Sequence, residues 1–195
     1  MSGAPGPERR RVAGAAPDIT RTRTRRTTVK ARTKEDQDVV AVILKDHRTM
    51  EDLFRKMRSV EADRAAALKE FAALLIAHGE AEEAEVYGAL KRYKGVDNEE
   101  VEHGEEEHAE GNEALLKLLE VEDVGSEEWD ARLEELVEAV SHHVDEEERT
   151  ILNGARESVS DERRAELGRA FQEERAKQLA SDCGSLENVR KIVHG

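Results

Sequence analysis

Apolar residues recur every three or four positions along most of this chain, which is the spacing of one face of an α-helix. Strand-like alternation is almost absent. Residues 1–33 depart from the pattern, because they contain all three prolines and almost no large apolar side chains. Such a segment buries too little surface to offset the entropy lost on ordering, so we expect it to be disordered.

Turns rich in glycine, asparagine and serine divide the helical pattern into five segments. We expect helices at about residues 35–60, 63–92, 99–120, 127–153 and 160–180. Asn98 and Ser126 are the expected N-caps of the third and fourth helices, since both side chains accept hydrogen bonds from free backbone N–H groups. The end of the chain, from Ser181 onward, is expected to be loosely packed.

Four long helices joined by short connections favour an antiparallel arrangement around a shared apolar core. The predicted fold class is therefore all-α: an up-down-up-down four-helix bundle with an extra C-terminal helix and a disordered basic N-terminal tail. The predicted divisions are the tail at 1–34, the bundle at 35–156, and the C-terminal helix and tail at 157–195.

Each of the four long helices has one histidine on its apolar stripe. These histidines are His47, His78, His108 and His143. Glutamates follow two of them at the same offset, Glu82 after His78 and Glu147 after His143, within HGEAEEAEVY and HVDEEERTIL. Residues four apart on a helix share a face, so each pair is expected to point into the core. The spacing also predicts an internal repeat of two related helical hairpins.

Two carboxylates on buried stripes need compensating positive charge, because an unpaired buried carboxylate costs several kcal/mol. No Lys or Arg lies on the stripes around them. A single histidine on a stripe is more often a hydrogen-bonded core residue than a ligand, and runs of glutamate are usually solvated. Four histidines on four stripes, two with glutamate at one offset, instead indicate a metal site of the nitrogen and oxygen type that suits iron or manganese.

Three further histidines lie off the stripes: His103, His142 and His194. His142 is about 100° around the helix from the stripe, so His143 is the preferred ligand. We interpret all three as surface groups, with His142 or His103 as the alternative ligand if the helical register differs by one residue.

Charge divides the chain into a basic tail and an acidic body. Residues 1–34 contain ten Lys and Arg against two Asp and Glu, whereas the remainder contains 21 against 43. The segment RTRTRRTTVKARTK is dense enough in charge for weak, non-specific nucleic-acid contact, although folding back on the acidic body, or no specific use, is the preferred interpretation. The single Cys183 rules out an intramolecular disulfide and favours the cytoplasm. No run is long enough to cross a membrane, and an organellar transit peptide stays an open alternative.

The histidine and glutamate pattern resembles that of the hemerythrin-like, or HHE cation-binding, family, over roughly residues 35–155. Proteins of that family are four-helix bundles that hold a non-haem di-iron centre, so the resemblance implies a cofactor of two iron ions. It also implies the metal ligands His47, His78, Glu82, His108, His143 and Glu147, with the two glutamates bridging the irons. Oxygen-carrying members have another histidine one turn before the position of His108, where this chain has Gly104.

The resemblance implies a small-molecule ligand such as dioxygen, nitric oxide or peroxide, and a role in oxygen or oxidative-stress response or in iron handling. Reversible oxygen carriage is not favoured, because Gly104 supplies no ligand; water, substrate or the nearby carboxylate of Glu107 are the alternatives for that position. Two other hypotheses remain. One is a di-iron enzyme that decomposes hydrogen peroxide or carries out another oxidation, and the other is a metal-free helical adaptor protein.

Overall fold

A computed structural model describes Met1, Gly3 and residues 37–195 of the chain, and residues 37–195 contain helices and no strand. The all-α prediction is confirmed for this part. The predicted basic tail, with its possible nucleic-acid contact, lies outside the described residues apart from Met1 and Gly3. No helix between residues 37 and 195 combines the length and the apolar character needed to cross a membrane.

The helices begin and end close to the predicted turns. They are α1 (Val39–Arg58), α2 (Arg64–Glu82), the π-helix η2 (Glu83–Tyr87), α3 (Gly88–Leu90), α4 (Asn98–Leu119), α5 (Glu127–Arg149), α6 (Ile151–Ser158), α7 (Asp161–Ala180) and α8 (Leu186–His194). The Ser126 side chain accepts a hydrogen bond from Trp129 N, as expected of an N-cap. Asp97 rather than Asn98 caps α4, because α4 begins one residue earlier than expected and the Asp97 carboxylate accepts from Glu99 N.

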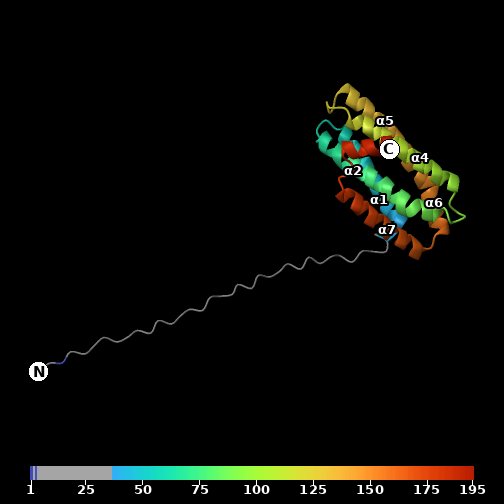
Figure 1. Ribbon diagram of the computed structural model, residues 1–195, viewed down its shortest axis with the longest axis horizontal. Coiled ribbons are helices and arrows are strands. Elements are labelled where there is room, and N and C mark those ends of the chain that lie inside the picture. Colours follow the sequence, from blue (N-terminus) through green and yellow to red (C-terminus); the bar gives the residue numbers. More distant parts are fainter. Residues whose placement is uncertain (2, 4–36) are drawn as a thin grey trace. The chain divides into compact units, whose positions relative to one another are not determined.

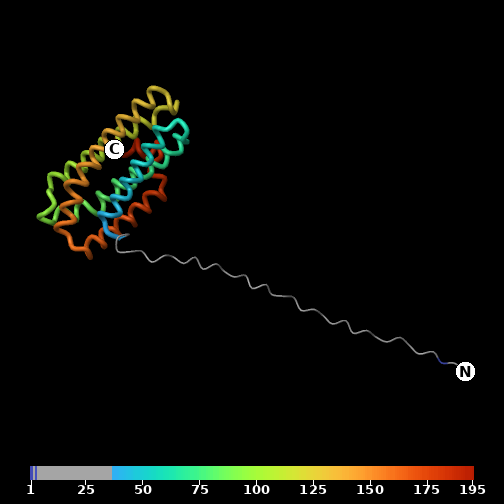
Figure 2. Tube along the Cα trace, turned by 180° about the vertical axis from the view of Figure 1, so that it is seen from behind, coloured from blue at the N-terminus to red at the C-terminus, as the bar shows by residue number. Residues whose placement is uncertain are grey.

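The long helices lie alongside one another, with α1 packed against α2 and α4 packed against α5 (Figures 1 and 2). α7 covers both α1 and α2. Buried apolar side chains form two clusters, and along α1, α2 and α4 the stripe histidine lies between residues of one cluster and residues of the other. For example, Ile43 belongs to one cluster and Met50 to the other, with His47 between them. The core therefore encloses a polar layer between two apolar ones.

The second predicted helix is divided, because a π-helical turn follows Glu82. A π-helical turn contains an extra residue, which changes the direction of the side chains that follow it, and such turns are frequent at functional sites. Here the consecutive residues Val86 and Tyr87 are both fully buried. The fourth predicted helix is also divided, since α5 ends at Arg149 and α6 begins at Ile151.

The end of the chain differs from the expectation of loose packing. Residues 186–194 form α8, which packs against α4 and buries Val189 completely. Leu186 and Ile192 lie three positions to either side of Val189 and pack against the same core cluster. The apolar spacing of a short amphipathic helix was therefore present in the sequence.

Candidate metal centre

All four stripe histidines lie in one buried layer, one each on α1, α2, α4 and α5. Two groups of side chains form there, each with donor atoms within 4.8 Å of one another. The first consists of His47, His78, Glu82 and Glu147, and the second of Glu82, His108 and His143. The structure thus brings together all six side chains that the sequence singled out, and Glu82 belongs to both groups.

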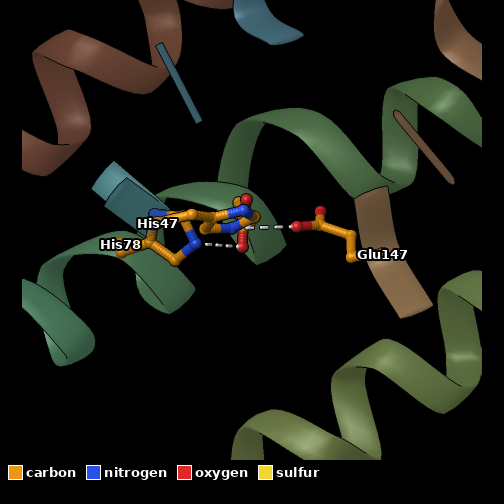
Figure 3. Close-up of side chains that lie close together, drawn as sticks. His47, His78 and Glu147 are labelled. Carbon is orange, nitrogen blue, oxygen red and sulfur yellow. Dashed lines mark ion pairs between the residues drawn. The ribbon is translucent and has the colours of Figure 1, made fainter. Parts of the chain in front are cut away.

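The Nε2 atoms of the imidazoles face the centre of this layer. His78 Nε2 and His108 Nε2 each lie 3.2 Å from the same oxygen of Glu82, Oε2. His47 Nε2 lies 3.3 Å from Glu147 Oε2 (Figure 3), and the Nε2 atoms of His108 and His143 are 3.1 Å apart. Nitrogen and oxygen donors from four helices therefore converge on a small volume.

Several of these converging atoms lack a hydrogen-bond partner among the described residues, although they are fully buried. They are His47 Nε2, His78 Nε2, both carboxylate oxygens of Glu82, and Glu147 Oε2. Buried polar atoms are almost always hydrogen-bonded or bound to an ion, since leaving them unpaired is costly. The donor set of imidazole and carboxylate is the one that iron and manganese accept, so these residues fit metal ions at this position.

Each imidazole also has a carboxylate at its other nitrogen, Nδ1. The pairs are His47 Nδ1 and Glu148 at 3.0 Å, His78 Nδ1 and Asp46 at 3.5 Å, His108 Nδ1 and Glu83 at 2.9 Å, and His143 Nδ1 and Glu107 at 3.0 Å. A carboxylate in that place accepts the Nδ1 proton, which directs the Nε2 lone pair toward a metal and fixes the orientation of the ring. The arrangement is typical of histidines that bind metals.

The contacts repeat between the two halves of the site, in keeping with the predicted repeat of two helical hairpins. His47 faces Glu147 and Glu148 of α5, whereas His108 faces Glu82 and Glu83, where α2 passes into η2. In each half, the residue just before the first histidine (His47 or His108) contacts the second histidine (His78 or His143). Asp46 thus faces His78, and Glu107 faces His143.

A family model described as the hemerythrin HHE cation binding domain matches residues 38–154, a span that includes every side chain of the layer. The chain belongs to the hemerythrin HHE family. No curated protein and no solved structure matched the chain in the corresponding searches. The family resemblance expected from the sequence is confirmed, and membership implies that this domain binds metal.

Oxygen-carrying hemerythrins have a histidine where this chain has Gly104, and here the Tyr87 side chain occupies the adjacent space. A Cβ atom placed on Gly104 would lie 3.2 Å from the Tyr87 hydroxyl oxygen. That hydroxyl donates a hydrogen bond to Glu147 Oε1 at 3.3 Å, and the Tyr87 ring stacks on His108 with centroids 5.5 Å apart. Burial, together with the negative charge of Glu147, raises the pKa of Tyr87 well above its usual value, so the phenol keeps its proton.

The charges of the layer favour protonated imidazoles when no metal is bound. Burial by itself lowers the pKa of His78, but the negative charges of Glu82 and Asp46 outweigh it and raise the pKa to about 10. Burial also lowers the pKa of His108, but the hydrogen bonds with Glu82 and Glu83 outweigh it and raise the pKa to about 9. In the metal-free protein these two protons therefore compensate the buried carboxylates.

Metal binding to the hemerythrin layer is expected to release protons, because His78 and His108 must lose theirs to act as ligands. Near neutral pH the affinity should rise about tenfold per pH unit for each proton displaced, or about 100-fold for both. Zinc titrations of the metal-free protein at pH 7 and pH 8, with proton release followed by calorimetry, measure this. Affinity that does not change with pH would contradict the expected protonation.

The same pKa values set the pH dependence of stability in the metal-free protein. Both folded-state values lie above the ordinary histidine value of about 6.5, so the stabilising effect of protonation is fully present below that pH. It is lost as the pH rises through about 9 for His108 and about 10 for His78.

Glu83 and Glu148, the second glutamates of the two repeated motifs, lie at the Nδ1 atoms of His108 and His47. The Glu-Glu doublet that both motifs share is the feature of the sequence that could have indicated this role. Glu107, which was considered for the open position, lies instead on the outer side of His143. Asp46 was missed, since its contact with His78 joins two helices and no spacing within one helix reveals it.

Proposed function

We propose that this hemerythrin-family chain is a non-haem di-iron protein that binds dioxygen or a related small ligand, nitric oxide or peroxide, in oxygen or oxidative-stress response or iron handling. The proposed iron ligands are His47, His78, Glu82, His108, His143 and Glu147. The convergence of four imidazole Nε2 atoms on the buried carboxylates of Glu82 and Glu147, three of whose four oxygens have no hydrogen-bond partner among the described residues, supports the proposal best. When bound, the two irons would supply electrons and open coordination positions for the small ligand.

The two groups that share Glu82 favour two metal ions over one. Each group includes two imidazoles, His47 and His78 in one and His108 and His143 in the other. Glu82, between two such pairs, would help to hold both ions, and the positive charge of the ions would offset the buried negative charge. Six protein ligands would leave coordination positions open on the two irons, where an exogenous ligand could bind.

The space beside the layer suits a small ligand. A cavity of about 20 Å³ borders His108 and His143 and is also lined by Gly111 and Asn112. A volume of that size holds roughly one water-sized molecule. A larger groove of about 730 Å³ lies between α1 and α7, and no histidine lines it. The geometry therefore favours a diatomic or similarly small ligand over an organic substrate.

Tyr87 is the side chain placed to act on a ligand next to Gly104. Its hydroxyl is buried, protonated and already donates to Glu147. Rotation of the hydroxyl about its C–O bond would let the same proton point to a ligand at the position that oxygen carriers fill with histidine. We infer that Tyr87 stabilises a bound anionic or polar ligand by hydrogen bonding.

Metal analysis followed by anaerobic reduction and oxygen addition tests the proposed function. Protein purified without chelator is expected to contain close to two irons per chain and to absorb in the near ultraviolet. After reduction, oxygen should give a stable adduct or one round of oxidation that stops after about one equivalent. A chain that contains no metal and stays folded in chelator would contradict the proposal and support the adaptor hypothesis.

Peroxide decomposition is the second candidate function, and the buried proton donor Tyr87 beside the open position favours it. An enzyme of this kind should evolve oxygen from hydrogen peroxide through many turnovers, whereas a sensor should respond once and saturate. Tyr87→Phe removes the donor and keeps the ring that stacks on His108, so it should slow turnover while iron content stays unchanged.

We also propose the domain organisation that this function requires. The layer would lie within an up-down-up-down four-helix bundle of α1, α2, α4 and α5 over residues 35–156, with residues 157–195 packed around it. A cytoplasmic location is proposed because the single cysteine, Cys183, suits a reducing compartment.

A further inference from the structure

A second group of metal-ligand side chains lies on α4 and α5, outside the central layer. We call it the outer His–Glu cluster, and it consists of His103, Glu107, His142 and Glu146. Each helix contributes a histidine and a glutamate four residues later, so both side chains of each pair leave the helix on the same face. One donor atom from each of the four residues lies within 4.8 Å of all the others. The cluster is therefore a HxxxE pair facing a HxxxE pair, as in the central motifs.

Glu107 gives this cluster an unpaired and buried oxygen. The residue is only 6% exposed, and its Oε2 atom lies 3.0 Å from His143 Nδ1. The other oxygen, Oε1, has no hydrogen-bond partner among residues 37–195. It points into the outer cluster, 3.6 Å from His103 Nε2 and 3.5 Å from His142 Nε2. A buried carboxylate oxygen in this state needs positive charge beside it.

In the other half of the internal repeat, the carboxylate equivalent to that of Glu107 has an arginine as its partner. Asp46, which contacts His78 as Glu107 contacts His143, forms an ion pair with Arg175 of α7, with 2.9 Å between Asp46 Oδ1 and an Arg175 guanidinium nitrogen. No Lys or Arg within the described part of the chain pairs with Glu107 in this way. The first half also lacks the outer ligands, since the positions equivalent to His103, His142 and Glu146 are Val42, Ala77 and Ala81.

We propose that the outer His–Glu cluster binds one divalent first-row transition-metal ion, with the Nε2 atoms of both histidines and one oxygen of each glutamate as ligands. The ion supplies the positive charge that Arg175 supplies in the other half of the repeat. Two imidazoles and two carboxylates suit zinc, ferrous iron or manganese. Donor atoms bound at about 2.0 to 2.2 Å lie roughly 3 to 4 Å from one another, and the separations of 3.5 to 3.7 Å between these atoms agree with that.

The outer cluster is open to solvent on one side, which gives an ion access to it. The side chains of His103 and His142 are 50% and 63% exposed. Glu107 then joins the outer ion to His143 through its two oxygens. The site differs from the central one in exposure and in all of its ligands, so the proposal does not depend on iron in the centre.

A zinc titration of the full-length chain tests the proposal. The protein is stripped with chelator, dialysed, and titrated with Zn²⁺ against a chromophoric competitor, in the wild type and in His103→Ala/His142→Ala. The double variant is expected to bind one zinc fewer per chain, or to bind that zinc at least about tenfold more weakly. Anomalous scattering at the zinc edge should place the ion between α4 and α5 in the wild type.

His194→Ala is the matched control, because His194 is an exposed histidine on α8, outside the cluster. It should bind zinc as the wild type does. The double variant should keep the iron content and the helical circular dichroism of the wild type, since both replaced side chains are half exposed or more. Equal zinc binding by wild type and double variant would overturn the proposal. Loss of iron from the double variant would assign these histidines to the central site and would also overturn it.

Discussion

Replacing His143 by alanine is expected to remove most of the iron from the purified protein. His143 belongs to the group with Glu82 and His108, with its Nε2 atom 3.1 Å from that of His108 and its Nδ1 atom 3.0 Å from Glu107. Losing only the outer partner of a metal-bound imidazole weakens metal affinity about 10- to 100-fold, and losing the imidazole itself should exceed that. Iron per chain, measured by atomic emission, gives the result directly.

His142→Ala is the matched control for this substitution. His142 is the adjacent residue on α5, but its side chain is 63% exposed and lies outside the central groups. Alanine has high helix propensity, so neither change should disrupt α5, and circular dichroism checks this. The control should keep both irons. If His142→Ala loses iron while His143→Ala keeps it, the proposed ligand assignment on α5 is wrong.

Gly168→Ala is expected to destabilise the protein strongly, because α7 approaches the start of α1 closely at this glycine. A Cβ atom at Gly168 would lie 1.9 Å from the backbone oxygen of Gln37 and 2.8 Å from Val39 N. Backbone atoms cannot rotate away as a side chain can, so α7 must move. Overpacking of this kind costs about 3 kcal/mol, which corresponds to a fall of roughly 6 to 12 °C in Tm.

The displacement should also reach the metal layer, since α7 supports His78 in two ways. The Phe171 ring meets the His78 ring edge-on with centroids 5.8 Å apart, and Arg175 holds Asp46 beside His78 Nδ1. Zinc affinity is therefore expected to fall together with Tm in Gly168→Ala.

Gly88→Ala is the control for Gly168→Ala. Gly88 is exposed at the start of α3, and a Cβ atom there would have no neighbour within 4 Å. Alanine is favoured over glycine in a helix by about 0.5 to 1 kcal/mol, so Tm should stay level or rise slightly. Thermal unfolding followed by circular dichroism measures both variants. If both change Tm alike, close contact between α7 and α1 is not what matters at Gly168.

The helices of this chain were predictable because their apolar spacing is a local property. Each stripe and each cap depends on residues within a few positions of one another, as at Ser126. The helix boundaries were less predictable where tertiary packing, and not the local sequence, selects between backbone conformations of similar energy. Neither the π-helical turn after Glu82 nor the break at Thr150 has a separate signal in the spacing.

The sequence alone determined the all-α class, the family and the set of histidines and glutamates that meet in the core. Helical periodicity places His78 beside Glu82 and His143 beside Glu147 whatever the rest of the chain does. The tertiary structure decided which carboxylate faces which ring nitrogen, that Tyr87 fills the space beside Gly104, and that Glu107 turns one oxygen outward. These contacts join different helices, and their distances depend on how the helices pack, which no spacing along one helix contains.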